Sequence, residues 1–207
     1  MAAGSFHALA LTSGGNVYAW GYNEQGRLGL GVSGHQIDGL QYNYYYTSAN
    51  PVVGVENSND EHLKNVISIA AGGLHSVAIR MDGTVFTWGS NSYGQLGNQR
   101  LGTSGSANRP VQVAAGDYAA GSYYIDQVVR VSAGYHHTMA LTRYGKLYTW
   151  GRNNNGQLGA GISAQYTNLP KAVDLSASGL DAEVGQIMDI AAGEYHSLAR
   201  TSDDTML

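Results

Sequence analysis

The chain has 207 residues, of which 43% are apolar and only 13% are charged, enough for one domain with a sizeable core. The net charge of −4 and the absence of any basic run argue against direct nucleic-acid binding, which needs clustered Lys and Arg. The chain contains no cysteine, which excludes disulfides and thiolate metal sites. No signal-peptide pattern follows Met1, and no apolar run approaches the ~20 residues that span a bilayer, so we expect no membrane contact.

An internal repeat organises the whole chain. A Gly-x-x-His step is followed, thirteen residues after the histidine, by Trp-Gly and then by Asn-x-x-Gly-x-Leu-Gly. The pattern predicts one repeat domain over residues 1–207, with approximate units at 1–65, 66–130 and 131–187 and a truncated unit at 188–207. The residues that recur are His7, His75, His137 and His196, Trp20, Trp88 and Trp150, and Gly21, Gly89 and Gly151.

Each unit has the pattern of four short antiparallel strands. In the second unit, alternating or small-residue runs predict strands at residues 66–72, 75–81, 84–90 and 110–114. Asp82-Gly83 predicts a hairpin in which both residues have positive φ. Pro110 places the fourth strand at a sheet edge, because proline cannot donate to a central ladder. In the fourth unit Asp204 stands where Gly83 stands in the second, which should weaken that hairpin.

Four short strands per unit, punctuated by glycine and aromatic residues, are typical of propeller blades. The fold class is therefore all-β, a β-propeller of four-stranded antiparallel blades. Small residues in the first strand suit the crowded propeller axis, and the tryptophans fill the space between adjacent blades.

The Ala-Gly-x-x-His, Trp-Gly and Asn-x-x-Gly-Gln-Leu-Gly motifs closely resemble the regulator of chromosome condensation repeat. The resemblance implies a β-propeller, usually of seven blades, and implies function much less, because one fold serves many partners. Three full repeats and a fragment predict a partial propeller, an open arc closed only by additional blades or chains. We expect either a piece of a longer polypeptide or an assembly that covers the exposed blade faces.

Long connections between the motifs carry tyrosines that the repeat does not explain. Tyrosine gives a large contact area at low entropic cost, and loops on a rigid scaffold commonly form binding surfaces. The alternative is a packed or disordered connection. The candidate partner-contact residues are Tyr42, Tyr44, Tyr45, Tyr46, Tyr123, Tyr124 and Tyr166.

The other candidate sites favour structural roles. The four histidines recur at one position per blade, so they cannot converge on one metal ion, and a hydrogen bond to a neighbouring backbone group explains them. The Asn-x-x-Gly-Gln-Leu-Gly segments are turns, since they lack the lysine and following helix of a phosphate loop. No nucleophile or zinc signature occurs. We therefore expect no enzyme activity, no catalytic residue, no cofactor and no metal.

The favoured function is a non-catalytic scaffold for protein–protein interaction or assembly, with a protein partner or further copies of the same chain. The resemblance implies one alternative, a guanine-nucleotide exchange factor for a small GTPase. Another is a secreted inhibitor or a surface or virion structural protein. The compartment stays open, although the composition is compatible with an extracellular or virion-associated setting.

Overall fold

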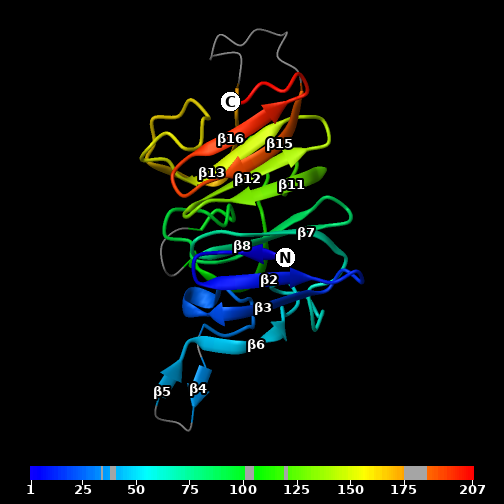
Figure 1. Cartoon of the computed structure of the whole chain (residues 1–207), viewed down its shortest axis with the longest axis vertical. Coiled ribbons are helices and arrows are strands. Elements are labelled where there is room, and N and C mark those ends of the chain that lie inside the picture. The colour runs from blue at the N-terminus through cyan, green and yellow to red at the C-terminus, as the bar shows by residue number, and fades with distance from the viewer. Residues whose placement is uncertain (34, 38–40, 101–104, 119–120, 175–185) are drawn as a thin grey trace.

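A computed structural model describes residues 1–33, 35–37, 41–100, 105–118, 121–174 and 186–207. Three four-stranded antiparallel sheets and one two-stranded sheet follow one another along the molecule (Figure 1). A fifth, small sheet is the hairpin of β4 (His35–Ile37) and β5 (Gln41–Asn43), which projects from the first blade (Figure 1). The predicted all-β fold of propeller blades is confirmed.

The blades have a regular strand order, from the inner strand to the outer edge. Blade 1 consists of β1 (Ala2–Ala3), β2 (His7–Leu11), β3 (Val17–Tyr22) and β6 (Tyr45–Pro51). Blade 2 consists of β7 (Val66–Ala71), β8 (His75–Arg80), β9 (Val85–Gly89) and β10 (Ala107–Gln112). Blade 3 consists of β11 (Val128–Ala133), β12 (His137–Thr142), β13 (Leu147–Arg152) and β14 (Tyr166–Ala172). Blade 4 contains β15 (Ile187–Ala192) and β16 (Ser197–Thr201).

The hairpins between the second and third strands differ from the prediction. Only Gly83 has positive φ, at 82°, and Asp82 does not, so the expectation for Asp82 is wrong. Gly83 N–H donates to Arg80 O at 2.9 Å and Arg80 N–H donates to Thr84 O at 3.0 Å. This is a three-residue loop with a bulge, which needs one left-handed residue rather than two. Asp204 takes the same conformation in the last hairpin, with φ of 64°.

The tryptophan of one blade packs on the preceding blade. Trp88 and Trp150 are fully buried, and their indole rings lie against Gly29 and Gly97, the last residues of the preceding Leu-Gly turns. Trp20, in blade 1, is only half-buried. The core is therefore a series of layers between blades, and among the described residues the first two layers each contain one buried indole ring while the layer between blades 3 and 4 contains none.

Glycine follows each tryptophan because the backbone requires it. Gly89 has φ of 106°, and a Cβ there would lie 2.7 Å from Leu74 O. Any side chain would be strained by the dihedral angle and would collide with the neighbouring strand. Gly21 and Gly151 have the same geometry, with φ of 105° and 103°.

The repeated histidines bind across the blade boundary. His7 Nε2 lies 2.8 Å from Ser76 Oγ, and His75 Nε2 lies 2.9 Å from Thr138 Oγ1. His137 continues the series, with Nε2 3.1 Å from Ser197 Oγ. Each histidine thus contacts the residue that directly follows the histidine of the next blade. The expected direct bond to a backbone group is wrong, since a hydroxyl side chain lies in between.

The hydroxyl groups complete the connection to the preceding blade. Ser76 Oγ donates to Arg27 O at 2.8 Å, and Thr138 Oγ1 donates to Gln95 O at 2.9 Å. Ser197 Oγ donates to Gln157 O at 2.7 Å. Each hydroxyl group donates its only proton to a carbonyl oxygen. The imidazole must therefore donate its Nε2 proton to the hydroxyl oxygen. We call this histidine–hydroxyl–carbonyl chain the latch.

The latch requires a neutral histidine. Burial lowers the pKa of His7 to about 3 and that of His137 to about 4, and it lowers the pKa of His75 well below the ordinary value. The Nδ1 atoms of these three rings are buried and have no hydrogen-bond partner among the described residues. A second ring proton would therefore lack an acceptor, which agrees with the lowered pKa values.

We predict that Thr138→Val destabilises the fold by about 1–3 kcal/mol, because it leaves the His75 Nε2 proton and the Gln95 carbonyl unpaired at constant side-chain shape. Urea unfolding followed by circular dichroism measures this. Thr138→Ser is the matched control, since it keeps the hydroxyl, and it should cost clearly less. Equal losses for the two variants would show that the methyl group matters and the latch does not.

We also predict that the chain becomes less stable as pH falls from 6.5 to 5. The latch histidines have lower pKa values folded than unfolded, so the unfolded chain binds more protons in this window, and stability is lost with falling pH. Each histidine contributes at most about 1.4 kcal/mol per pH unit, a slope that is approached as pH falls below the unfolded pKa. The free energy of unfolding at pH 7, 6 and 5 tests this, and His7→Gln should reduce the slope. A flat profile would contradict it.

Candidate functional site: an aromatic face beside an axial groove

Two kinds of turn lie on one side of the molecule. In an antiparallel blade, the turn between the first and second strands and the connection from the third to the fourth emerge at the same end of the sheet. The first turn contains the two variable residues of Gly-x-x-His, and the second begins with the residue after Trp-Gly. Variable residues of all the blades therefore share one side, which we call the aromatic face. Its aromatic and arginine residues are Phe6, Tyr22, Tyr44, Tyr45, Tyr93, Tyr135, His136, Arg152, Tyr166 and Tyr195.

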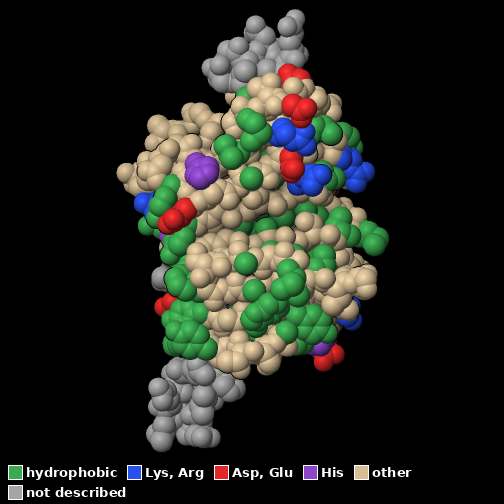
Figure 2. Space-filling model, in the orientation of Figure 1, with side chains coloured by type: hydrophobic (Ala, Val, Ile, Leu, Met, Phe, Trp, Pro, Cys, Tyr) green, Lys and Arg blue, Asp and Glu red, His purple; other side chains and the backbone are tan. Residues whose placement is uncertain are grey.

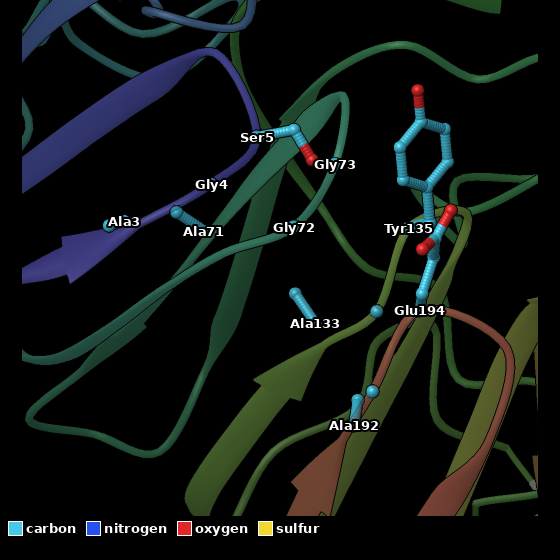
Figure 3. Close-up of a pocket in the computed structure, with 12 residues that line it drawn as sticks. Ala3, Gly4, Ser5, Ala71, Gly72, Gly73, Ala133, Tyr135, Ala192 and Glu194 are labelled. Carbon is cyan, nitrogen blue, oxygen red and sulfur yellow. The ribbon is translucent and has the colours of Figure 1, made fainter.

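The inner ends of the four blades form a groove along the axis. The groove has a volume of about 330 Å³ and is lined by small residues of every blade, including Gly4, Gly72 and Gly134. A Cβ at Gly72 would lie 2.5 Å from Gly134 O, so the inner strands approach too closely for side chains. Figure 3 shows Tyr135 and Glu194 as the two large side chains that stand beside this mostly backbone-lined space.

Blade 1 carries the first aromatic cluster. The Tyr22 ring lies 6.4 Å from Phe6, 5.8 Å from Tyr44 and 4.9 Å from Tyr45, measured between ring centroids. Phe6 is 54% and Tyr45 65% exposed. Figure 2 shows, on one side of the molecule, hydrophobic side chains over the half that blades 1 and 2 form, and charged residues of both signs over β15 and β16.

A second cluster joins blades 2, 3 and 4. We call it the tyrosine–arginine cluster and define it as Tyr93, Tyr135, His136, Arg152 and Tyr195. The His136 ring lies 4.7 Å from both Tyr93 and Tyr135, and Tyr135 lies 6.5 Å from Tyr195. The Arg152 guanidinium lies over the rings of Tyr93 and Tyr195 at 5.0 and 5.9 Å. Tyr135 also lines the groove, so the cluster borders it.

The predicted contact tyrosines of blade 1 are not all in a connection. Tyr45 and Tyr46 open the outer strand β6, where they pair with Tyr22 and Gly21. Tyr44 directly precedes that strand and belongs to the aromatic cluster. Tyr42 lies in β5, and its side chain is outside the described residues.

The remaining predicted contact tyrosines lie in the connection from β10 to β11 and at the start of β14. Tyr123 and Tyr124 lie in the connection from β10 to β11, with 84% and 50% of their surface exposed. Tyr166 begins β14 and pairs with Arg152, so it borders the tyrosine–arginine cluster. Tyr44, Tyr45 and Tyr166 thus lie at the aromatic face, and Tyr123 and Tyr124 lie on the inter-blade connection.

Sequence reasoning missed several members of the aromatic face. Phe6 and Tyr195 occupy the position before the repeated histidine, and Tyr22 follows Trp-Gly. The signal that marks them in the sequence is an aromatic residue at a variable position inside the repeat motif.

The described residues offer no group of three or more His, Cys, Asp or Glu side chains that could hold a metal ion. Within the same residues, no helix has the length and apolar character needed to cross a bilayer.

Comparison with known proteins identifies the family to which this architecture belongs. A family model described as the RCC1-like domain matches residues 1–207. The chain belongs to the RCC1-like domain family. This RCC1-like chain is 31% identical to the ultraviolet-B receptor UVR8 of Arabidopsis thaliana over 224 residues, covering 90% of the chain and 48% of the receptor. It is 33% identical to the probable E3 ubiquitin-protein ligase HERC6 of Homo sapiens over 198 residues, covering 95% of the chain and 16% of that protein.

Solved structures agree with the partial propeller. The RCC1-like chain superposes on yeast RCC1 (Prp20), crystallised with Kap60, with a TM-score of 0.73 and 25% identity. The match covers 98% of this chain and 41% of the yeast chain. The chain therefore spans less than half the length of each of these three proteins.

Arg27 is the unusual residue of the blade 1–2 boundary. Its side chain is 1% exposed, its guanidinium lies 5.1 Å from the Tyr22 ring centroid, and its Nη2 lies 3.5 Å from Glu24 Oε2. Burial lowers its pKa, and its Nη1 has no partner among the described residues.

Gln95 occupies the position of blade 2 that is equivalent to Arg27, and its carbonyl also accepts Trp150 Nε1–H at 2.9 Å. The corresponding Trp88 Nε1 is buried and has no hydrogen-bond partner in the part of the chain that the structure describes.

We predict that Arg27→Gln stabilises the RCC1-like chain by about 1 kcal/mol, because it removes a buried cation with an unmet donor while the ion pair to exposed Glu24 contributes little. Chemical unfolding at pH 7 measures the change, and Gln95→Arg is the reciprocal variant, which should be destabilising. A clear loss of stability in Arg27→Gln would mean that the Tyr22 and Glu24 contacts outweigh the desolvation of the guanidinium.

Proposed function

We propose that this chain is a non-catalytic β-propeller segment that binds protein partners through its aromatic face. The observation that carries the proposal is the difference in position between the constant and the variable residues of the repeat. The constant polar residues are internal and bonded to one another in the latches. The variable residues on one side are aromatic and partly exposed, as at Phe6, Tyr45 and Tyr195.

Physical reasons favour a protein partner. Rigid, half-exposed aromatic rings lose little entropy on binding and are enriched among residues that dominate binding energy. Small-residue strands beside them leave space for a polypeptide segment in the groove. Among the structural neighbours, yeast RCC1 (Prp20) is crystallised bound to Kap60, which supports a protein partner for the related fold.

A second candidate is exchange of guanine nucleotides on a small GTPase. It is favoured by the likeness to yeast RCC1 over 98% of this chain. The direct test measures release of a fluorescent guanine nucleotide from a small GTPase with and without the chain. No acceleration at saturating concentrations would remove this candidate and leave the binding proposal intact.

The binding proposal is tested with a random twelve-residue peptide library selected on the purified chain. Selected peptides should lose at least ~10-fold in affinity for the double variant Phe6→Ala with Tyr45→Ala, because exposed aromatic anchors dominate such contacts. The matched control is Met81→Ala with Tyr144→Ala, which removes side chains that are at least as exposed, at 73% and 66%, from the hairpins on the opposite side. Equal affinity for both double variants, or failure to select any peptide, would contradict the proposal.

A further inference from the structure

Arg152 is a cation without a carboxylate partner. Its Nε donates to Asn154 Oδ1 at 3.4 Å, and no carboxylate oxygen of the described residues lies within ion-pair distance of it. Arg109 and Arg143 likewise have no carboxylate within ion-pair distance among the described residues, whereas five other arginines each lie near one acidic side chain. These pairs are Arg27–Glu24, Arg80–Asp60, Arg100–Glu56, Arg130–Asp189 and Arg200–Asp204.

The surroundings of Arg152 hold its guanidinium in place. Tyr93 of blade 2 and Tyr195 of blade 4 contact it with their rings at 5.0 and 5.9 Å. Its backbone is fixed as well, because Arg152 N–H donates to His136 O at 2.9 Å. The Nη donors of Arg152 have no hydrogen-bond partner among the described residues, and the side chain is partly exposed, so these donors are accessible to another group.

Neighbouring titratable groups leave this charge uncompensated. His136 is half-buried next to Arg152, and its Nδ1 lies 3.3 Å from Gln95 Nε2, which donates to it. Burial, with a smaller contribution from Arg152, lowers the pKa of His136 to about 4, so the ring is neutral near pH 7. The Glu194 carboxylate is engaged with the hydroxyl of Tyr195.

We propose that Arg152 anchors an acidic side chain, Asp or Glu, of a partner polypeptide that lies on the aromatic face. The inference rests on the proposed protein-binding function and adds the chemistry of the partner. A carboxylate matches the two Nη donors of a guanidinium in a bidentate geometry, and the flanking rings exclude water from the pair. Residues next to the acidic one would contact Tyr135 and enter the groove that it borders.

Charge distinguishes a carboxylate from a phosphate at this position. Glu194 lies directly beside the cluster, where Tyr135 N–H donates to Glu194 O at 3.4 Å, and the whole chain carries a net charge of −4. Arg152 supplies one positive charge, which a single carboxylate neutralises, whereas the second charge of a phosphate dianion would remain unpaired beside Glu194. The structure therefore favours an unmodified acidic peptide.

The experiment uses three blocked heptapeptides, N-acetylated and C-amidated, that differ only at the central residue, which is Glu, Gln or phosphoserine. Binding to the full chain is followed by the Nε–H NMR signal of Arg152, assigned by its loss in Arg152→Gln. We expect the Glu peptide to shift this signal and to bind at least ~10-fold more tightly than the Gln peptide, the size of one charge-assisted pair.

Variants of Arg152 and Arg130 test whether the preference for Glu depends on the Arg152 side chain or on the stability of the fold. Arg152→Gln should abolish the preference for Glu over Gln, and Arg152→Lys should keep only part of it, because lysine lacks the planar fork. Arg130→Gln is the matched control, since Arg130 is exposed and already paired with Asp189 at 3.6 Å, and it should leave the preference unchanged. All three variants should keep the melting temperature of the parent chain.

Equal binding of the Glu and Gln peptides would overturn the anchor, and so would tighter, Arg152-dependent binding of the phosphoserine peptide. Failure of the Arg152 anchor is distinguishable from failure of the proposed protein-binding function. If the selected library peptides need Phe6 and Tyr45 but contain no acidic residue, the function stands and the anchor fails. If the Glu peptide shifts the Arg152 signal while no library peptide depends on the aromatic face, the anchor stands and the wider binding surface fails.

Discussion

Every boundary between blades depends on one neutral histidine that donates across it. The Nε2 proton goes to a hydroxyl of the next blade, and that hydroxyl donates back to a carbonyl of the histidine's own blade, as in His75, Thr138 and Gln95. Three polar groups are thereby satisfied at a boundary that is packed mainly with hydrophobic side chains. Since a buried unpaired donor costs more than a paired one contributes, the chain must keep all three groups together.

This constraint also determines where function can lie. The latch histidine fixes the turn that precedes it, so the two variable residues of Gly-x-x-His always emerge at the same side. Glycines such as Gly72 allow the inner strands to meet, which forms the groove beside these turns. The interior of the repeat is thus held constant, while the residues at the aromatic face can differ from blade to blade without altering the fold.

The repeat made the fold predictable, because its recurring motifs and alternating runs place four strands and a tryptophan in each complete blade. The hydroxyl partner was not predictable, since it follows the histidine of a different blade and only the folded geometry brings Thr138 to His75. Tyr45 and Tyr46 were expected in a connection, yet backbone pairing with β3 makes them a strand. The tyrosine–arginine cluster escaped prediction because Tyr93, Arg152 and Tyr195 come from three blades and meet only at the propeller surface.

The central claim concerns the protonation state of the latch, and NMR of ¹⁵N-labelled histidine tests it most directly. Long-range proton–nitrogen correlations distinguish the two neutral tautomers from the charged ring. The latch predicts that His7, His75 and His137 are neutral with the proton on Nε2 at pH 7, and that they remain so at pH 5 while the chain is folded. A proton on Nδ1, or a charged ring at pH 5 in the folded chain, would contradict the account.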